Sequence, residues 1–152
     1  MGRIIIFTGK GGVGKTSVAA AHAVFSASQG KKTLLVSTDM AHNLTDVFEI
    51  KAGRQTRRVT EYLDILELDP DWLMQKEYPG LRLTLARLAG DKNGVSLKSD
   101  EYFLLPGFEN LFSLLKIRSL YLSGKYDRIL VDCAPTGETL SLLKLPELLA
   151  WY

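Results

Sequence analysis

Gly9-Lys10-Gly11-Gly12-Val13-Gly14-Lys15-Thr16 matches the pattern G-x-x-x-x-G-K-[S/T] of a phosphate-binding loop. Its glycines lack a Cβ, so the backbone can take positive φ and bring its N–H groups against phosphate oxygens. Lys15 supplies a positive charge for the β- and γ-phosphates, and the Thr16 hydroxyl is a hard oxygen ligand for Mg²⁺. A helix that begins at about Lys15 would add its dipole and the first-turn residue Ser17 to the same anion site. The stretch therefore predicts a nucleotide site.

The flanking sequence predicts a strand before this loop and a helix after it. Ile4–Thr8 is apolar and β-branched, as is typical of a strand buried on both faces. Ser17–Phe25 is rich in alanine, and Gly30 is a suitable end for a helix. Thr33–Thr38 then predicts a second strand, and so compact a strand, helix, strand order indicates a right-handed unit with parallel strands. We therefore predict an α/β P-loop NTPase fold of three αβα layers around a mainly parallel sheet.

Composition limits the other classes. A chain of 152 residues fits one domain, 1–152, and its net charge of +2 with 24% charged residues implies no broad nucleic-acid or membrane-binding surface. No apolar run is long enough to cross a bilayer, and the start of the chain lacks a cleavable-signal pattern, which favours the cytoplasm. The single cysteine, Cys133, can form neither an internal disulfide nor a cysteine-only metal cluster and is most simply a small buried hydrophobe.

Asp39 directly follows the second predicted strand, at the end where open α/β sheets bind ligands. A carboxylate at this place can orient or deprotonate the water that attacks a γ-phosphate. Asp39 or Asn43 could instead be the N-cap of a helix from Leu44 onward. The spacing of the residues leaves both readings open.

The middle of the chain carries weaker signals. The segment Lys51–Arg58 holds four basic residues and no acid, which suits either a phosphate or lipid contact or, more commonly, a solvated loop edge. Tyr62–Leu68 predicts an edge strand, and Asp71–Tyr78 predicts a helix. A further helix, with Leu81, Leu85 and Leu88 on one stripe, and a polar loop at Asp91–Gly94 complete a predicted helical excursion over 70–100.

A third buried strand, Arg128–Asp132, follows a predicted helix over Phe108–Leu122. An acid at the end of such a strand is where P-loop proteins hold Mg²⁺, usually through water, so Asp132 and Thr16 are the predicted metal residues. Gly137 lies just beyond the strand and can turn its backbone N–H towards a γ-phosphate.

Two further stretches carry a resemblance to a known family. Lys10, at the second position of the loop, resembles the lysine of the signature-lysine ATPases. Ser37-Thr38-Asp39-Met40-Ala41-His42-Asn43-Leu44 resembles the first switch, S-T-D-P-A-H-x-L, of the arsenite-pump and tail-anchored-protein-targeting ATPases. Asp132-Cys133-Ala134-Pro135-Thr136-Gly137-Glu138-Thr139-Leu140 resembles their second switch, D-T-A-P-T-G-H-T-L. The family has proline where Met40 stands and histidine where Glu138 stands.

The resemblance implies roles for three residues. Lys10 would reach the nucleotide of a partner subunit or partner half, Asp39 would position the attacking water, and Asp132 would serve the Walker B role. Family members continue well beyond the second switch, so we expect this chain to be an N-terminal half or to need a partner. The fold is then expected to be incomplete at the C-terminus of the chain, with the remaining strands of the sheet in the missing half.

The function predicted from these motifs is Mg²⁺-dependent ATP hydrolysis. By the resemblance, a homodimer or a pair of ATPase halves would couple an ATP cycle to membrane-protein targeting or to oxyanion efflux, with a membrane-protein client and peripheral contact with the membrane. Nucleic acid is not among the expected partners. The alternative is a nucleotide-dependent binding or assembly switch with negligible turnover.

Overall fold

The computed structural model describes residues 2–9, 14–39, 41, 44–84, 87 and 108–133. Its helices and strands in chain order are β1 (Arg3–Phe7), α1 (Lys15–Ser28), β2 (Thr33–Ser37), α2 (Leu44–Phe48), β3 (Arg57–Thr60), β4 (Leu63–Glu67), α3 (Pro70–Trp72), the π-helical turn η1 (Leu73–Glu77), α5 (Phe108–Leu122) and β5 (Arg128–Asp132). Residues 79–84 are also helical. None of the helices in these ranges is both long enough and apolar enough to cross a lipid bilayer.

The strands form one sheet in the order β1-β5-β2-β4-β3. The pairs β1–β5, β5–β2 and β2–β4 are parallel, whereas β3 runs antiparallel to β4. Asp132, the last residue of β5, pairs in register with Phe7 on β1 and with Ser37 on β2. The predicted α/β fold with a mainly parallel sheet is confirmed, and the parallel strands place their carboxyl ends along one edge.

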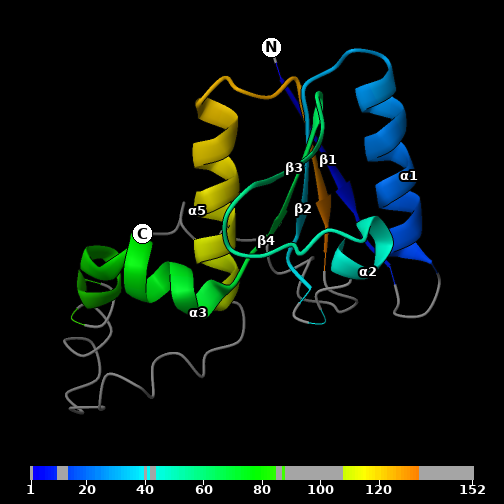
Figure 1. Cartoon of the computed structure of the whole chain (residues 1–152). Coiled ribbons are helices and arrows are strands. Elements are labelled where there is room, and N and C mark those ends of the chain that lie inside the picture. Colours follow the sequence, from blue (N-terminus) through cyan, green and yellow to red (C-terminus); the bar gives the residue numbers. More distant parts are fainter. Residues whose placement is uncertain are drawn as a thin grey trace.

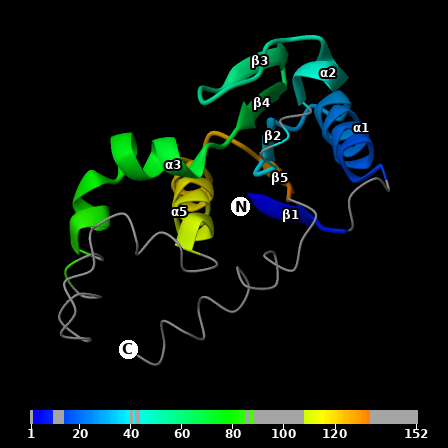
Figure 2. The same cartoon turned by 90° about the horizontal axis from the view of Figure 1, so that it is seen from below.

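The sheet lies between two helical layers, with α1 on one face and α5 on the other (Figure 1 and Figure 2). Successive strand residues point to opposite faces. On β2, Leu34 and Val36 pack in one core cluster with Phe112 of α5, while Leu35 packs in the other with the alanines of α1. The predicted strand Thr33–Thr38 is therefore apolar on both sides because helices cover both of its faces.

Helix α1 begins and ends where the sequence predicts. Its N-cap is Gly14, its alanine face at 19, 20, 23 and 27 is buried against the sheet, and the Gly30 N–H donates to the carbonyl of Ala27 at 2.9 Å. Small side chains on this face let the helix backbone approach the sheet closely. The predicted helix Phe108–Leu122 is confirmed as α5.

Strand β1 differs from the prediction because it is not buried on both faces. Ile5 and Phe7 pack against the α1 side of the core, whereas Ile4 and Ile6 are exposed. In the described part of the chain β1 is the last strand on its side of the sheet, and α5 lies over β5 and β2 instead. The apolar run correctly predicted a strand, but the prediction that both of its faces are buried is wrong.

Strand β4 was predicted as an edge strand, and that prediction is wrong. Strand β3 pairs on its outer side, so β4 lies between β2 and β3. The sequence missed β3 because Arg57 and Arg58 fall in the basic segment that favoured a loop. Charged residues are common on edge strands, where they discourage pairing with other chains. A register shift between Arg58 and Thr60 also interrupts the regular pairing of β3 with β4.

The helical excursion can be followed only in part. The predicted helix Asp71–Tyr78 corresponds to α3 and η1, and Asp69 caps its start by accepting from the Trp72 N–H at 3.1 Å. Leu81 packs against the α5 side of the core. Leu85, Leu88 and the predicted loop at Asp91–Gly94 lie outside the residues whose side chains or backbone are described.

Candidate nucleotide-binding site

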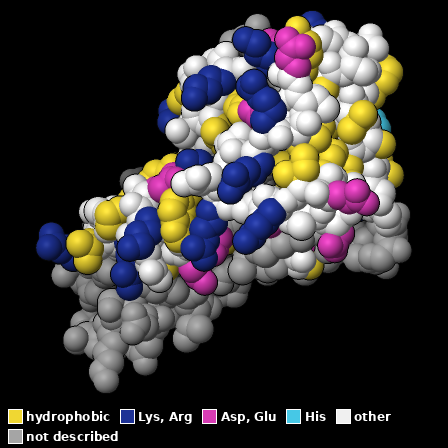
Figure 3. All heavy atoms as spheres, in the orientation of Figure 1, with side chains coloured by type: hydrophobic (Ala, Val, Ile, Leu, Met, Phe, Trp, Pro, Cys, Tyr) yellow, Lys and Arg dark blue, Asp and Glu magenta, His cyan; other side chains and the backbone are white. Residues whose placement is uncertain are grey.

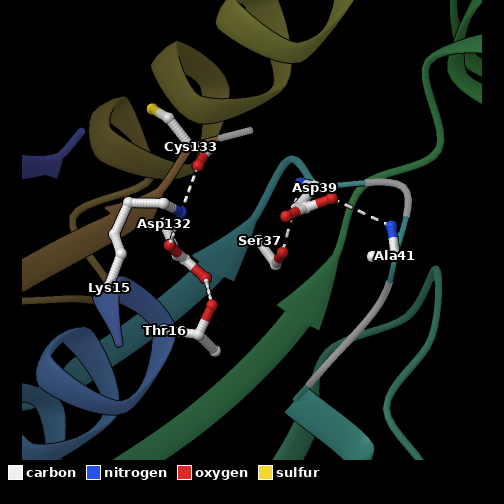
Figure 4. A network of polar contacts seen from close by, with 7 residues as sticks. All are labelled: Lys15, Thr16, Ser37, Asp39, Ala41, Asp132 and Cys133. Atoms are coloured by element: carbon white, nitrogen blue, oxygen red, sulfur yellow. Dashed lines mark hydrogen bonds and ion pairs between the residues drawn. The ribbon is translucent and has the colours of Figure 1, made fainter. Parts of the chain in front are cut away.

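The start of α1 and the ends of β2 and β5 meet at the carboxyl edge of the sheet (Figure 4). Two backbone hydrogen bonds continue the sheet just past the strands. The Thr38 N–H donates to the Asp132 carbonyl at 3.0 Å, and the Cys133 N–H donates to the Phe7 carbonyl at 3.1 Å. The residues that follow β2 and β5 are therefore fixed relative to each other and to the end of β1.

Asp132 is the centre of the site. One carboxylate oxygen, Oδ2, accepts a hydrogen bond from Thr16 Oγ1 at 2.7 Å, and the other, Oδ1, pairs with Lys15 Nζ (Figure 4). The Lys15 ammonium also donates to the carbonyl of Cys133. Only 8% of the Lys15 side chain and 1% of the Asp132 side chain are exposed. A buried charge needs such partners, because its desolvation is otherwise unfavourable.

The first turn of α1 presents its backbone N–H groups without a side-chain cap. Its N-cap residue is Gly14, at φ 77°, and no acidic residue lies in the first turn. An L-residue with a Cβ rarely adopts this conformation, which explains the glycine. Uncapped N–H groups and the positive end of the helix dipole together favour an anion such as phosphate. Thr16 and the exposed Ser17 lie in the same turn.

Gly9, at the other described end of the predicted loop, has φ 155°. The predicted nucleotide-binding residues Lys10, Gly11, Gly12 and Val13 lie outside the described residues, as does Gly137 beyond β5. The structure thus brings together Lys15, Thr16 and Asp132.

Asp39 lies two residues past the end of β2, the strand that pairs with β5 (Figure 4). Its N–H donates to Ser37 Oγ at 3.2 Å, and its Oδ1 accepts from the Ala41 N–H at 2.9 Å. The carboxylate of Asp39 therefore stabilises the turn from Asp39 to Ala41, and α2 begins only at Leu44, five residues after Asp39. The described contacts therefore do not place Asp39 as the α2 cap, and Asn43 lies outside the described residues.

Sequence reasoning did not foresee how these groups contact one another. It assigned Lys15 to phosphates and Asp132 to a metal, whereas in the structure the two side chains pair directly. The Cys133 carbonyl, a third member of this contact, is a backbone group that no residue type could reveal. Ser37, which supports the Asp39 turn, gave no signal beyond its place at a strand end.

The described groups fit a magnesium nucleotide. Mg²⁺ prefers hard oxygen ligands and usually keeps several waters. The Thr16 hydroxyl and the Asp132 carboxylate are such ligands, and they lie 2.7 Å apart at the end of a helix that favours phosphate. The Lys15 ammonium adds the positive charge that polyphosphate requires.

Comparison with known proteins finds relatives of this chain. The sequence profile of the family described as anion-transporting ATPase matches residues 2–152. The chain is 44% identical over 149 residues to a protein of Chlorobaculum tepidum named "Putative arsenical pump-driving ATPase". It is 37% identical over 150 residues to "ATPase get3" of Neurospora crassa and 38% identical over 148 residues to "ATPase ASNA1 homolog 1" of Paramecium tetraurelia.

These matches cover nearly all of this chain but less than half of each relative. They span 98%, 97% and 95% of the chain, and 37%, 44% and 44% of the three relatives in the same order. The chain corresponds to the amino-terminal part of these longer proteins. The resemblance drawn from the loop and the two switches is confirmed, because the chain belongs to the anion-transporting ATPase family.

Proposed function

We propose that this chain is the nucleotide-binding part of a Mg²⁺-dependent ATPase. The observation that carries the proposal is the single contact set in which Asp132 joins Thr16 and Lys15 at the uncapped start of α1. A hydroxyl, a carboxylate and an ammonium around a helix N-terminus are the groups needed to bind a metal-bound polyphosphate.

The residues of this site have separate roles in the proposal. Thr16 and Asp132 hold the metal, Asp132 through water, while Lys15 and the first-turn N–H groups bind phosphate oxygens. When bound, Mg²⁺ supplies positive charge that stabilises the phosphate oxygens during hydrolysis. The Lys15 ammonium uses two N–H donors for Asp132 and Cys133 and has a further N–H for a ligand.

Lys10 and Asp39 complete the proposed chemistry. Asp39 orients the attacking water, and its turn beside Ser37 places it next to the strand that carries Asp132. Lys10 acts across the interface with a second subunit or a second ATPase half. By the arsenical pump in the name of one relative and by the resemblance of the two switches, the ATP cycle would serve oxyanion efflux or the targeting of membrane proteins.

The first experiment measures ATP binding and phosphate release by the chain, with and without Mg²⁺. Lys15→Ala should weaken ATP binding by about 100-fold, because it removes hydrogen bonds between charged groups. Lys31→Ala is the matched control, since Lys31 is an exposed lysine outside the site. Circular dichroism checks that both variants fold. Unchanged ATP affinity in folded Lys15→Ala would contradict the nucleotide site.

Asp39→Asn separates binding from hydrolysis in the same assay. The amide keeps the hydrogen bond to Ala41 but loses the charge that positions or deprotonates water, so ATP binding should persist while turnover falls about 100-fold or more. An unchanged hydrolysis rate would mean that a residue other than Asp39 positions the attacking water. ATP binding by the parent chain without any phosphate release would instead favour the nucleotide-dependent switch.

A further inference from the structure

A basic pocket lies between the loop that follows α2, the start of β3 and α3. We define it as the cavity lined by residues 51–55, Arg57 and Trp72, with a volume of about 490 Å³. Its lining includes three cationic side chains, those of Lys51, Arg54 and Arg57, and no acidic residue. The sequence left this segment open as either a phosphate or lipid contact or a solvated loop edge.

The loop that forms the basic pocket is held in a fixed shape. The Ala52 N–H donates to Thr45 Oγ1 of α2 at 3.1 Å. The Gly53 carbonyl accepts a hydrogen bond from the Glu67 N–H of β4 at 3.0 Å. Ala52 itself is buried. The cationic side chains therefore extend from an anchored backbone, which reduces the entropy lost when they bind a ligand.

Arg54 is oriented before any ligand arrives. Its Nε and Nη2 donate to Asp69 Oδ2 at 3.1 and 2.9 Å, and its guanidinium carbon lies 5.8 Å from the centre of the Trp72 ring. The side chain is nevertheless 55% exposed. A guanidinium has more N–H donors than these contacts use, so Arg54 can still bind an oxyanion.

Lys51 and Arg57 carry charge that is not neutralised locally. Both are exposed, and neither has a carboxylate partner within 4.0 Å in the described part of the chain. The next residue, Arg58, differs because it pairs with Asp64 at 3.4 Å. Figure 3 looks onto this face, where Lys and Arg side chains gather in a band across β3, the loop before it and the helical residues that follow α3. The basic pocket is therefore locally positive although the chain as a whole is nearly balanced.

We propose that the basic pocket docks this chain on membranes by binding the phosphate-bearing headgroups of anionic phospholipids. Exposed cations are attracted to such surfaces, and a partly exposed tryptophan is suited to the level of the headgroups because its ring is apolar with one polar N–H. None of these residues belongs to the proposed nucleotide site, so this inference does not depend on ATPase activity.

The test measures co-sedimentation of the whole chain with vesicles of phosphatidylcholine alone or mixed with phosphatidylglycerol. We expect binding only to the mixed vesicles. This binding should be lost in molar salt, where the electrostatic screening length falls to about 3 Å. Lys51→Gln combined with Arg57→Gln should weaken binding about 30-fold, at about fivefold for each cation near the surface. ATP binding, measured alongside, should not change.

The matched control is Lys31→Gln combined with Lys125→Gln. Both lysines are exposed, and they lie outside the basic pocket. The two double variants have the same net charge, so an effect of total charge would weaken both equally. An equal loss in the two variants, or no binding to either kind of vesicle in low salt, would overturn the proposal.

Trp72 gives a second and local readout. The chain has two tryptophans, so Trp151→Phe leaves Trp72 as the only one. Its fluorescence should shift to shorter wavelength with anionic vesicles, because the indole enters a less polar environment. A response to inorganic pyrophosphate without any response to vesicles would overturn the lipid assignment in favour of a soluble anion.

Discussion

The two ends of the sheet each hold a carboxylate with a cationic partner, but in different surroundings. At the carboxyl edge, Asp132 and Lys15 are almost wholly buried and Thr16 shares the carboxylate. At the amino edge, Asp64 is 17% exposed and its partner Arg58 is 72% exposed. A surface pair of this second kind contributes little to stability, whereas a buried pair must offset a large desolvation cost. The carboxyl edge thus carries an arrangement that stability alone does not favour, as expected of a binding site.

The amino edge instead joins strands. Tyr126, which precedes β5, donates its hydroxyl hydrogen to Asp64 Oδ2 of β4 at 2.7 Å, across a gap of 62 residues. Burial, and then the hydrogen bond to Asp64, raise the pKa of the Tyr126 hydroxyl well above its ordinary value. The neutral hydroxyl therefore fixes the β3–β4 hairpin to the start of β5.

The largest effect on stability should come from Asp132→Asn. The amide can still accept from Thr16, but Lys15 is left as a buried cation without its counter-charge. We expect the free energy of unfolding to fall by about 3 kcal/mol. Urea unfolding followed by circular dichroism measures this change.

Asp64→Asn is the matched control for that substitution. It removes the same charge from the pair with the exposed Arg58, while the amide oxygen can still accept from the Tyr126 hydroxyl, so the loss should be about 1 kcal/mol or less. Equal losses for the two variants would contradict the contrast between the two edges.

The strands that end at the carboxyl edge were predicted from sequence, whereas the strand pairing at the amino edge was not. The glycine loop, Asp39 and Asp132 stand at the ends of apolar runs, where strand and helix signals are strong. Strand β3 and its pairing with β4 were not predicted, because the charged residues Arg57 and Arg58 of this exposed strand favoured a loop. The contact of Lys15 with Asp132 spans 117 residues, and only the parallel register of β1, β5 and β2 brings such distant groups together.

A smaller loss is expected for Tyr126→Phe. This change removes the hydroxyl that donates to Asp64 and leaves the ring in place, so the free energy of unfolding should fall by about 1 kcal/mol. Tyr62→Phe is the control, because in the described residues the Tyr62 hydroxyl makes no hydrogen bond. If both variants unfold at the same urea concentration as the parent chain, the hydroxyl does not join the strands.

The smallest effect is a difference in pH dependence between the parent chain and Tyr126→Phe. The raised pKa means that, above the ordinary tyrosine value of 10.0, Tyr126 loses its proton in the unfolded chain while the folded chain retains it. The folded state then binds more protons, so its stability decreases as pH rises through this range, whereas the contribution of Tyr126 is constant at lower pH. Phenylalanine cannot titrate, so the gap in unfolding free energy between the two chains should narrow above pH 10.0. Urea unfolding at pH 8 and at about pH 10.5 measures that gap, and a constant gap would mean that the Tyr126 hydroxyl titrates as it does in water.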